Sequence, residues 1–287
     1  RYDGLRPYLF HKVHLEVSGG HGVGECPFCG KHAFSVDAVT GLGRCFVCAV
    51  GTASGGFNPV VFLRLLHERS VATTDDAFLF EVAEDRKLAD ADTVSAWGVC
   101  KSSIDGTWLV PGYGPDGVLD QLYRRARVKK GDGWVWCLLP TPGVWPEGKV
   151  HALHMPAIHN TTSTDWKTAF NIAVCEGPWD GMVLWEVTRG NVVAVPGCNV
   201  WRDDWTEMCR DKHVTLLFDS DHPIPEALEQ GRIERAGYDG MERVARKLTG
   251  TAASVRYIRW GEDGYDTMKK SGWDIRDHLT SSDNREV

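Results

Sequence analysis

Four cysteines stand in two closely spaced pairs near the start of the chain. Cys26 and Cys29 form the first C-x2-C pair, and Cys45 and Cys48 form the second, with fifteen residues between the pairs. Each pair can form a turn that places two thiolates about 2.3 Å from one tetrahedral ion, and this spacing is typical of a zinc ribbon. Four thiolates leave no open coordination position, so the sequence predicts a structural Zn²⁺ site.

Carboxylates follow two apolar segments in the second half of the chain. Glu176 comes directly after the segment 172–175, and Asp219 and Asp221 come directly after 214–218. Ligands of an open parallel sheet bind beyond the carboxyl ends of its strands, so these side chains are expected to converge there. Oxygen ligands suit Mg²⁺ or Mn²⁺. Each motif also has a simpler explanation, because Glu176 could cap a helix and the Asp219/Asp221 pair could form an acidic turn.

Alternating strands and helices are expected to position these carboxylates. The predicted strands are 172–175, 192–195, 214–218 and 254–258. Short apolar strands that alternate with helices favour an α/β fold with a mostly parallel sheet flanked by helices. Before this region, residues 95–165 are predicted to be rich in strands, with strands at 108–111, 118–123 and 134–137.

A run of cations lies in the middle of the chain. It includes Arg124, Arg125, Arg127 and Lys129. In a strand, Arg125, Arg127 and Lys129 would share one face. Cations of this kind bind phosphate, and Arg can do so bidentately. The alternative is an ordinary solvated face.

The composition is that of a globular protein with two or three modules. The chain has 287 residues, of which 43% are hydrophobic and 25% charged. It contains no apolar run of about 18 residues, so no membrane span is expected. Nine cysteines is an odd number, and only four are closely paired, which favours a reducing compartment over a disulfide framework. The net charge of −7 does not by itself indicate a nucleic-acid binder, but carboxylates gathered at a metal site would lower it.

Two acidic motifs carry a family resemblance. Residues 176–181 (EGPWDG) and 219–221 (DSD) resemble the TOPRIM domain that primases, topoisomerases and some nucleases share. Together with the preceding cysteine ribbon, they make the chain similar to the bacterial and phage DNA primases, and the four-cysteine pattern is closer to the phage primases. Residues 273–279 (WDIRDHL) resemble an acidic motif at the end of the family's core.

The resemblance implies a function and a set of roles. It implies a primase that makes short RNA primers from NTPs on a single-stranded DNA template. Glu176, Asp219 and Asp221 would hold one or two catalytic Mg²⁺ or Mn²⁺ ions, with Glu176 as a further candidate for general base. Asp180 would support them from the start of the next helix. The basic residues that would contact template and nucleotide are Arg124, Arg125, Arg127 and Lys129.

The resemblance and the composition of the chain together give an expected domain order, and residues 66–95 match no part of the family. The expected parts are a zinc-ribbon template-binding domain with a trailing helix (1–70), a linker or surface helix pair (71–94), a basic N-terminal subdomain of the RNA polymerase core (95–167), a TOPRIM subdomain (168–262), and a C-terminal motif and tail (263–287). Asn58 is predicted to cap the trailing helix and Pro59 to begin it. The expected partner is a replicative helicase, separate or fused in a longer chain. The expected location is the cytoplasm of a bacterial cell or of a phage-infected host.

Two other functions fit part of the pattern. A recombination mediator that joins a zinc finger to a TOPRIM fold would bind DNA without catalysis, although such proteins lack a middle segment like 95–165. A TOPRIM nuclease would degrade DNA or RNA without NTPs.

Overall fold

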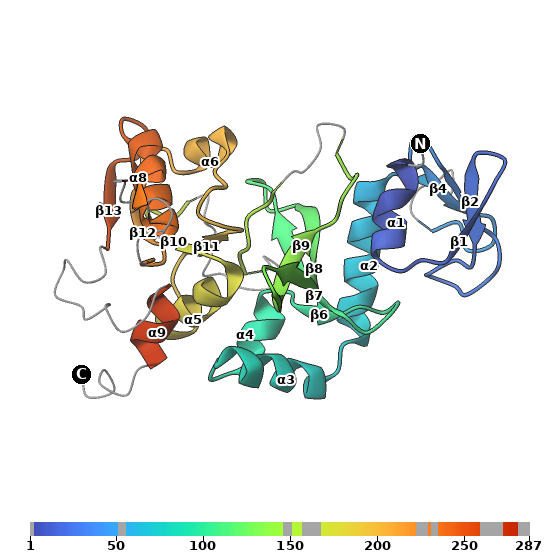
Figure 1. Cartoon of the computed structure of the whole chain (residues 1–287), viewed down its shortest axis with the longest axis horizontal. Coiled ribbons are helices and arrows are strands. Elements are labelled where there is room, and N and C mark those ends of the chain that lie inside the picture. Colours follow the sequence, from blue (N-terminus) through green and yellow to red (C-terminus); the bar gives the residue numbers. More distant parts are fainter. Residues whose placement is uncertain are drawn as a thin grey trace. The chain divides into compact units, whose positions relative to one another are not determined.

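A computed structural model describes most of the chain. The described residues are 3–50, 56–145, 151–156, 168–221, 229–230, 235–258 and 272–280. They belong to two compact units, and Figure 1 labels many of their helices and strands. Unit 1 comprises Arg1–Phe80, Gly98–Tyr113 and Val118–Ala152, and unit 2 comprises Glu81–Trp97, Gly114–Gly117 and Leu153–Val287. The predicted ribbon domain thus shares a unit with much of the predicted basic subdomain, and the five-part domain division stays a prediction.

Unit 1 begins with a small antiparallel sheet. After η1 (Asp3–Leu5) and α1 (Arg6–Phe10), its strands follow one another in chain order: β1 (Leu15–Ser18), β2 (His21–Gly24), β3 (Phe34–Asp37), β4 (Gly43–Cys45) and β5 (Gly56–Phe57). Aromatic rings form its core. The ring centroids of Tyr8 and Phe62 are 4.4 Å apart, and the Phe34 ring stacks on the Phe57 ring with their centroids 5.8 Å apart. This core holds the small sheet against the helix that follows it.

That helix, α2 (Pro59–Thr73), begins as the sequence predicts. The Oδ1 of Asn58 accepts a hydrogen bond from the Val61 N–H at 2.9 Å, and Pro59 occupies the first turn. Leu63 and Leu66 are completely buried on its inner side. The cap and the buried face confirm the predicted start of the trailing helix.

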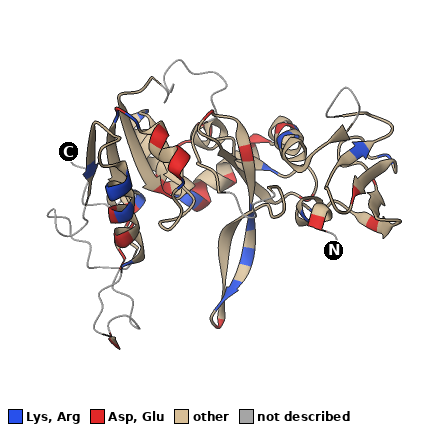
Figure 2. Ribbon diagram, turned by 90° about the horizontal axis from the view of Figure 1, so that it is seen from above, with Lys and Arg blue, Asp and Glu red and all other residues tan. Residues whose placement is uncertain are grey.

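A second antiparallel sheet completes unit 1. Its strands, again in chain order, are β6 (Cys100–Lys101), β7 (Trp108–Tyr113), β8 (Leu119–Lys130) and β9 (Gly133–Pro140). β8 continues beyond the predicted strand, so the whole basic run is extended. Figure 2 shows its Lys and Arg positions in blue along the hairpin that β8 and β9 form.

The segment 71–94, expected as a linker or a surface helix pair, is largely helical. It holds the end of α2, all of α3 (Asp76–Arg86) and the start of α4 (Ala91–Ala96). In unit 2, Glu186 accepts hydrogen bonds from the N–H groups of Ala89 and Asp90, both at 2.8 Å, and from the Thr93 hydroxyl at 3.0 Å. The chain before and within α4 is therefore fixed to the helix that carries Glu186.

Unit 2 is built on a four-stranded parallel sheet of order β11–β10–β12–β13. The strands are β10 (Asn171–Glu176), β11 (Val192–Val195), β12 (His213–Leu217) and β13 (Ser254–Tyr257). Besides α4 and the end of α3, its described helices include α5 (Pro178–Thr188), α6 (Asp203–Met208), α8 (Ala236–Leu248) and α9 (Ile275–Thr280). The predicted α/β fold with a parallel sheet is confirmed, and each predicted strand of this sheet agrees within one residue.

None of the described helices combines the length and the apolar character needed to cross a bilayer. Of the predicted C-terminal segment 263–287, residues 272–280 lie within the described part of the chain.

Candidate metal centres

The four predicted cysteines come together in unit 1. Sγ of Cys26 lies 3.8 Å from Sγ of Cys48, and Sγ of Cys29 lies 3.7 Å from Sγ of Cys45. All four sulfur atoms are within 4.8 Å of one another, and none forms a disulfide. A regular tetrahedron with metal–sulfur bonds of about 2.3 Å has sulfur–sulfur edges of about 3.8 Å. The cluster therefore has the dimensions of one tetrahedral metal site.

Backbone N–H groups donate hydrogen bonds to two of these sulfurs. The Phe28 N–H points at the sulfur of Cys26, at 3.4 Å, and the Val47 and Cys48 N–H groups point at the sulfur of Cys45, at 3.4 and 3.5 Å. Hydrogen bonds to a sulfur favour its thiolate form, which is the form that binds metal. Both C-x2-C turns thus present their cysteines as metal ligands.

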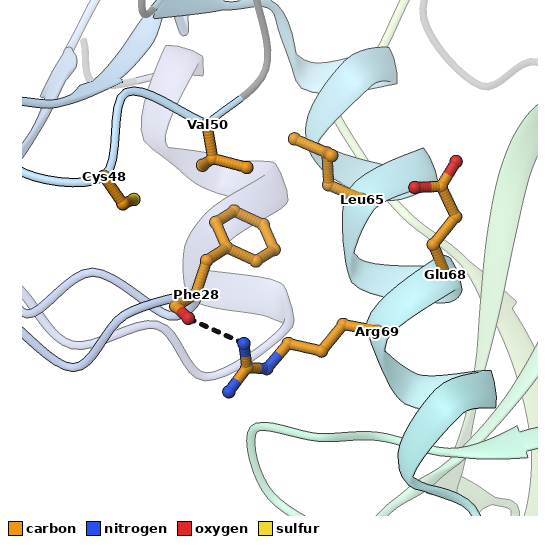
Figure 3. A pocket seen from close by; sticks show the side chains of 6 residues that line it. All are labelled: Phe28, Cys48, Val50, Leu65, Glu68 and Arg69. Carbon is orange, nitrogen blue, oxygen red and sulfur yellow. Dashed lines mark hydrogen bonds between the residues drawn. The ribbon is translucent and has the colours of Figure 1, made fainter.

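A hollow lies beside the cysteine cluster, between the ribbon and α2 (Figure 3). It measures about 300 Å³ and is lined by Phe28, Cys48, Val50, Leu65, Glu68 and Arg69. The Phe28 ring points toward Val50 and Leu65, and Nη1 of Arg69 donates a hydrogen bond to the Phe28 carbonyl at 2.6 Å. This contact joins the first C-x2-C turn directly to α2.

The predicted carboxylates lie at one edge of the parallel sheet in unit 2. Glu176 ends β10, and Asp219 follows the neighbouring parallel strand β12. Oε1 of Glu176 accepts a hydrogen bond from the Cys198 N–H at 3.1 Å. Oε2 of Glu176 and Oδ1 of Asp219 are buried and have no hydrogen-bond partner among the described residues. Two buried acceptors are therefore left for a ligand that no described residue supplies.

Asp180 lies closer to this site than the sequence suggests. Its oxygen is grouped with those of Asp219 and Asp274, all within 4.8 Å of one another. Gly177, with φ of 92°, turns the chain from β10 into α5, so the first turn of the helix reaches the same edge. Predicted as a supporting residue, Asp180 thus belongs to the carboxylate group itself, and the residue is only 6% exposed.

Asp274 is the residue of this group to which the sequence assigned no role. Ser220 and Trp273 form an antiparallel bridge, in which the Ser220 N–H donates to the Trp273 carbonyl at 2.8 Å. The bridge brings Asp274 to Asp219. Oδ1 of Asp274 also accepts the Asp277 N–H at 2.7 Å, at the start of α9. The motif at 273–279 was the available signal, but its partner across the bridge was not visible in the sequence.

Asp221 lies at the side of the group. Its Oδ2 accepts the Gly237 N–H at 2.8 Å, at the start of α8. Gly237 is needed there, because a Cβ on it would overlap the Asp219 carbonyl oxygen and lie 3.1 Å from Oε2 of Glu176. The first turn of α8 therefore packs directly on the carboxylates, through a glycine that the sequence-based site did not include.

Burial and mutual repulsion act on these acids together. Burial, followed by the charges of Glu176, Asp180 and Asp274, raises the pKa of Asp219 to about 10. Burial and the neighbouring Asp274 raise the pKa of Asp180 well above its ordinary value, against the opposing effect of Arg276. Burial also raises the pKa of Glu176. Grouped buried carboxylates favour protonation unless a cation joins them, and their oxygens suit a hard divalent ion.

Among the described residues, Arg276 is the cation in contact with the group. Nη2 of Arg276 is 2.8 Å from Oδ2 of Asp274, and its Nε is 3.7 Å from Oδ1 of Asp180. Within the described part of the chain, this one guanidinium does not balance the carboxylates of Glu176, Asp180, Asp219 and Asp274. The composition of the group fits a site for Mg²⁺ or Mn²⁺.

The predicted basic residues divide between the two faces of β8. Arg124 is 9% exposed, forms an ion pair with Asp105 and donates to the Thr107 hydroxyl at 3.1 Å. Arg125, Arg127 and Lys129 share the opposite face, as the strand pattern predicts, and Arg127 and Lys129 are exposed. Arg124 is therefore held inside unit 1, whereas the other face of the strand presents cations to solvent.

Comparisons with known proteins give distant likenesses. No protein-family model matches the chain, and no curated protein matches it. Among solved structures, the zinc-binding and RNA polymerase domains of the Aquifex aeolicus primase are similar at 15% identity and a TM-score of 0.45, over 97% of this chain and 82% of that one. A structure of the DnaG catalytic core is similar at 12% identity and a TM-score of 0.45, over 76% of this chain and 72% of that one.

A third likeness is to a chain in a structure of the bacteriophage T7 lagging-strand DNA polymerase with primase domains of two gp4 subunits bound to an RNA/DNA hybrid and dTTP. It has 19% identity and a TM-score of 0.38, over 60% of this chain and 76% of that one. All three likenesses have TM-scores below 0.5.

Proposed function

We propose that this protein is a DNA primase, which synthesises short RNA primers from NTPs on a single-stranded DNA template. The observation that carries the proposal is the group of buried carboxylates at the edge of the parallel sheet, with Asp180, Asp219 and Asp274 within 4.8 Å of one another and Glu176 beside them. Nucleotidyl transfer requires such a group, because divalent cations are held by carboxylates and in turn bind phosphate oxygens.

The carboxylates would hold one or two Mg²⁺ or Mn²⁺ ions. Bound there, the metal would activate the primer 3′-hydroxyl and stabilise the charge on the transferred phosphate and the pyrophosphate. Asp219 and Glu176 each keep a buried oxygen without a hydrogen-bond partner among the described residues, and these atoms are the first candidates for ligands. Asp221, whose Oδ2 accepts the Gly237 N–H, keeps its second oxygen for the same purpose.

Two side chains have roles beyond holding metal. Glu176 is a candidate general base for the 3′-hydroxyl, because burial raises its pKa and so strengthens it as a proton acceptor. Arg276 would hold Asp274 and Asp180 in place through its contacts with both, and so orient their remaining oxygens.

The four cysteines would hold a structural Zn²⁺ ion, and the ribbon would read the template. Closed tetrahedral sulfur sites stabilise folds rather than perform catalysis. The hydrogen bond between Arg69 and the Phe28 carbonyl would fix the position of the zinc ribbon relative to α2.

The exposed cations of β8 would contact template and nucleotide. Arg127 and Lys129 are exposed on the face that can reach phosphates, and half-buried Arg125 lies on the same face, whereas Arg124 is held by Asp105. We therefore assign Arg124 to positioning the turn before β7, in place of the nucleotide contact expected from the sequence. The same proposal includes a replicative helicase as partner, either separate or fused in a longer chain. It also includes membership of the phage type of primase and a cytoplasmic location.

The test is primer synthesis with single-stranded DNA, NTPs and Mg²⁺, followed by analysis of the products for short RNA. Glu176→Gln and Asp219→Asn should both abolish the product. Wild-type synthesis by both variants would remove the metal assignment. Degradation of nucleic acid without NTPs would identify a nuclease instead, and binding without either reaction would identify a recombination mediator.

A further inference from the structure

The hairpin of β8 and β9 carries tryptophans on the same face as its cations. In the antiparallel register, Arg127 lies opposite Trp136 and Lys129 lies opposite Trp134. Residues directly opposite each other in a sheet project from the same face. Arg125, two residues before Arg127, belongs to this face as well. Cations and indoles therefore stand side by side along one surface, called here the hairpin face: Arg125, Arg127, Lys129, Trp134 and Trp136.

The two tryptophans of the hairpin face are exposed to an unusual degree. Trp134 is 60% exposed and Trp136 57%, whereas Trp97 and Trp205 are almost completely buried. They stand two residues apart on one strand, about 6.7 Å along its axis. Large aromatic side chains that do not pack in a core and lie next to each other indicate a binding surface.

Cations hold one of these indoles in place. Cζ of Arg125 lies 3.7 Å from the ring centroid of Trp108 and 4.7 Å from that of Trp136, so its guanidinium packs between the two rings. Cζ of Arg127 lies 5.9 Å from the ring of Trp136. Cation–π contacts of this kind orient a ring without covering it, which leaves the outer surface of Trp136 available.

The combination selects one class of ligand. The chain has a net charge of −7, yet this face carries three cations, so its complement is a polyanion. Exposed aromatic rings stack on bases that are unpaired, whereas a duplex covers its base faces. An apolar protein segment would use the indoles but not the cations. A single nucleic-acid strand uses both.

We propose that the hairpin face binds single-stranded DNA by stacking unpaired bases on Trp134 and Trp136 while Arg127 and Lys129 contact the neighbouring phosphates. The identity of that strand as the primase template rests on the proposed function, but the binding itself does not. Base stacking on the hairpin face would add to the contacts with template and nucleotide that were predicted for the cations of β8.

The experiment measures the affinity of the full chain for a fluorescently labelled oligo-dT strand, without NTPs. Trp134→Ala and Trp136→Ala should each weaken binding about 10-fold, because each variant removes one aromatic ring on which a base stacks. Val135→Ala changes the intervening residue, on the opposite face of β9, and should leave the affinity unchanged. Trp136→Phe keeps an aromatic ring and should retain most of the binding.

The salt dependence tests the cations separately. Arg127→Ala and Lys129→Ala should each reduce the slope of log affinity against log salt by about 0.7, the value for one phosphate contact on a single strand. Lys130→Ala is the matched control, because it removes the same charge one residue away on the opposite face. A duplex of equal length should bind more weakly than the single strand.

The outcomes separate this inference from the proposed function. If Trp134→Ala and Trp136→Ala, each with a wild-type circular dichroism spectrum, bind oligo-dT as well as the wild type, the stacking surface is wrong even if primers are made. If both lose affinity while Val135→Ala and Trp136→Phe keep it, the surface stands even if no primer is ever detected. Equal loss in the Val135→Ala control would assign the effect to hairpin folding and overturn the proposal.

Discussion

Asp274 lies beside Asp219 because the residues next to them, Trp273 and Ser220, form an antiparallel bridge. The bridge joins a segment near the end of the chain to the end of a central strand. It adds a carboxylate to the group that the sequence places at the sheet edge. With Asp274 included, the group surrounds Asp219 from β10, α5 and the start of α9.

Asp274→Asn is therefore expected to weaken metal binding and primer synthesis together. Removing one charged ligand should lower Mn²⁺ affinity at least about 10-fold, because supporting residues of metal sites alone contribute 10- to 100-fold. Mn²⁺ binding by electron paramagnetic resonance checks the first effect and primer yield the second. Asp76→Asn, the same change at an exposed position at the start of α3, is the control. Unchanged Mn²⁺ affinity in Asp274→Asn would exclude Asp274 from the site.

The pKa of Asp219 gives a prediction for the metal-free protein. Its folded-state pKa of about 10 lies far above the value of about 4 for an unfolded chain. Between these values the folded state binds the proton more tightly, so stability falls as pH rises from about 4 toward 10. Asp219→Asn removes this dependence. With both proteins in EDTA, the Tm of Asp219→Asn minus the Tm of the wild type should therefore be larger at pH 8 than at pH 5.

At pH 8, added Mg²⁺ or Mn²⁺ should stabilise the wild type more than Asp219→Asn. A ligand that binds only the folded state raises its stability in proportion to the logarithm of ligand concentration over Kd. The wild type should gain Tm with metal, and Asp219→Asn should gain little. Thermal unfolding with and without metal measures both. Equal gains in the two proteins would mean that the metal binds elsewhere.

Gly237→Ala tests the packing of α8 on the carboxylates. Replacing an unhindered glycine inside a helix by alanine stabilises the fold by up to about 1 kcal/mol. At Gly237 the added methyl would overlap the Asp219 carbonyl, so the sign should reverse, with a loss of about 1–3 kcal/mol. Denaturant unfolding measures the change. Gly133→Ala, where a Cβ would meet only one atom at 3.9 Å, should not show a loss of this size. A stabilised Gly237→Ala variant would contradict the described geometry.

Cys45→Ser is expected to remove the zinc site and leave the carboxylate site in place. Three sulfurs hold Zn²⁺ less tightly than four, and the ribbon depends on the metal for its fold. Zinc content should fall from one ion per chain, and initiation on natural templates should be lost. Mn²⁺ binding at the carboxylates should remain. Normal initiation by a zinc-free Cys45→Ser variant would show that the ribbon does not read the template.

Local signals in the sequence predicted much of the fold. Period and composition identified the strands of the parallel sheet, and the polar cap at Asn58 identified the start of α2. The C-x2-C pairs were sufficient to predict the sulfur cluster, because both turns are short and each brings its own two ligands together. These features depend on residues close to one another in the chain.

The remaining features depend on contacts between distant segments. The bridge between Ser220 and Trp273 determines that Asp274 joins the group, and no local pattern announces such a pairing. The ion pair of Arg124 with Asp105 likewise depends on the register of β7 and β8. A run of cations predicts an exposed basic strand, but only the pairing decides which of its faces is buried.

The most direct measurement of the central claim is primer synthesis by the wild type and by Asp219→Asn in the same Mg²⁺ titration, on a library of single-stranded templates. We expect short RNA products from the wild type that begin at a restricted set of sequences and require the metal, and none from Asp219→Asn at any Mg²⁺ concentration. If Asp219→Asn made as much short RNA as the wild type at the same Mg²⁺ concentrations, that result would contradict a catalytic metal centre at these carboxylates.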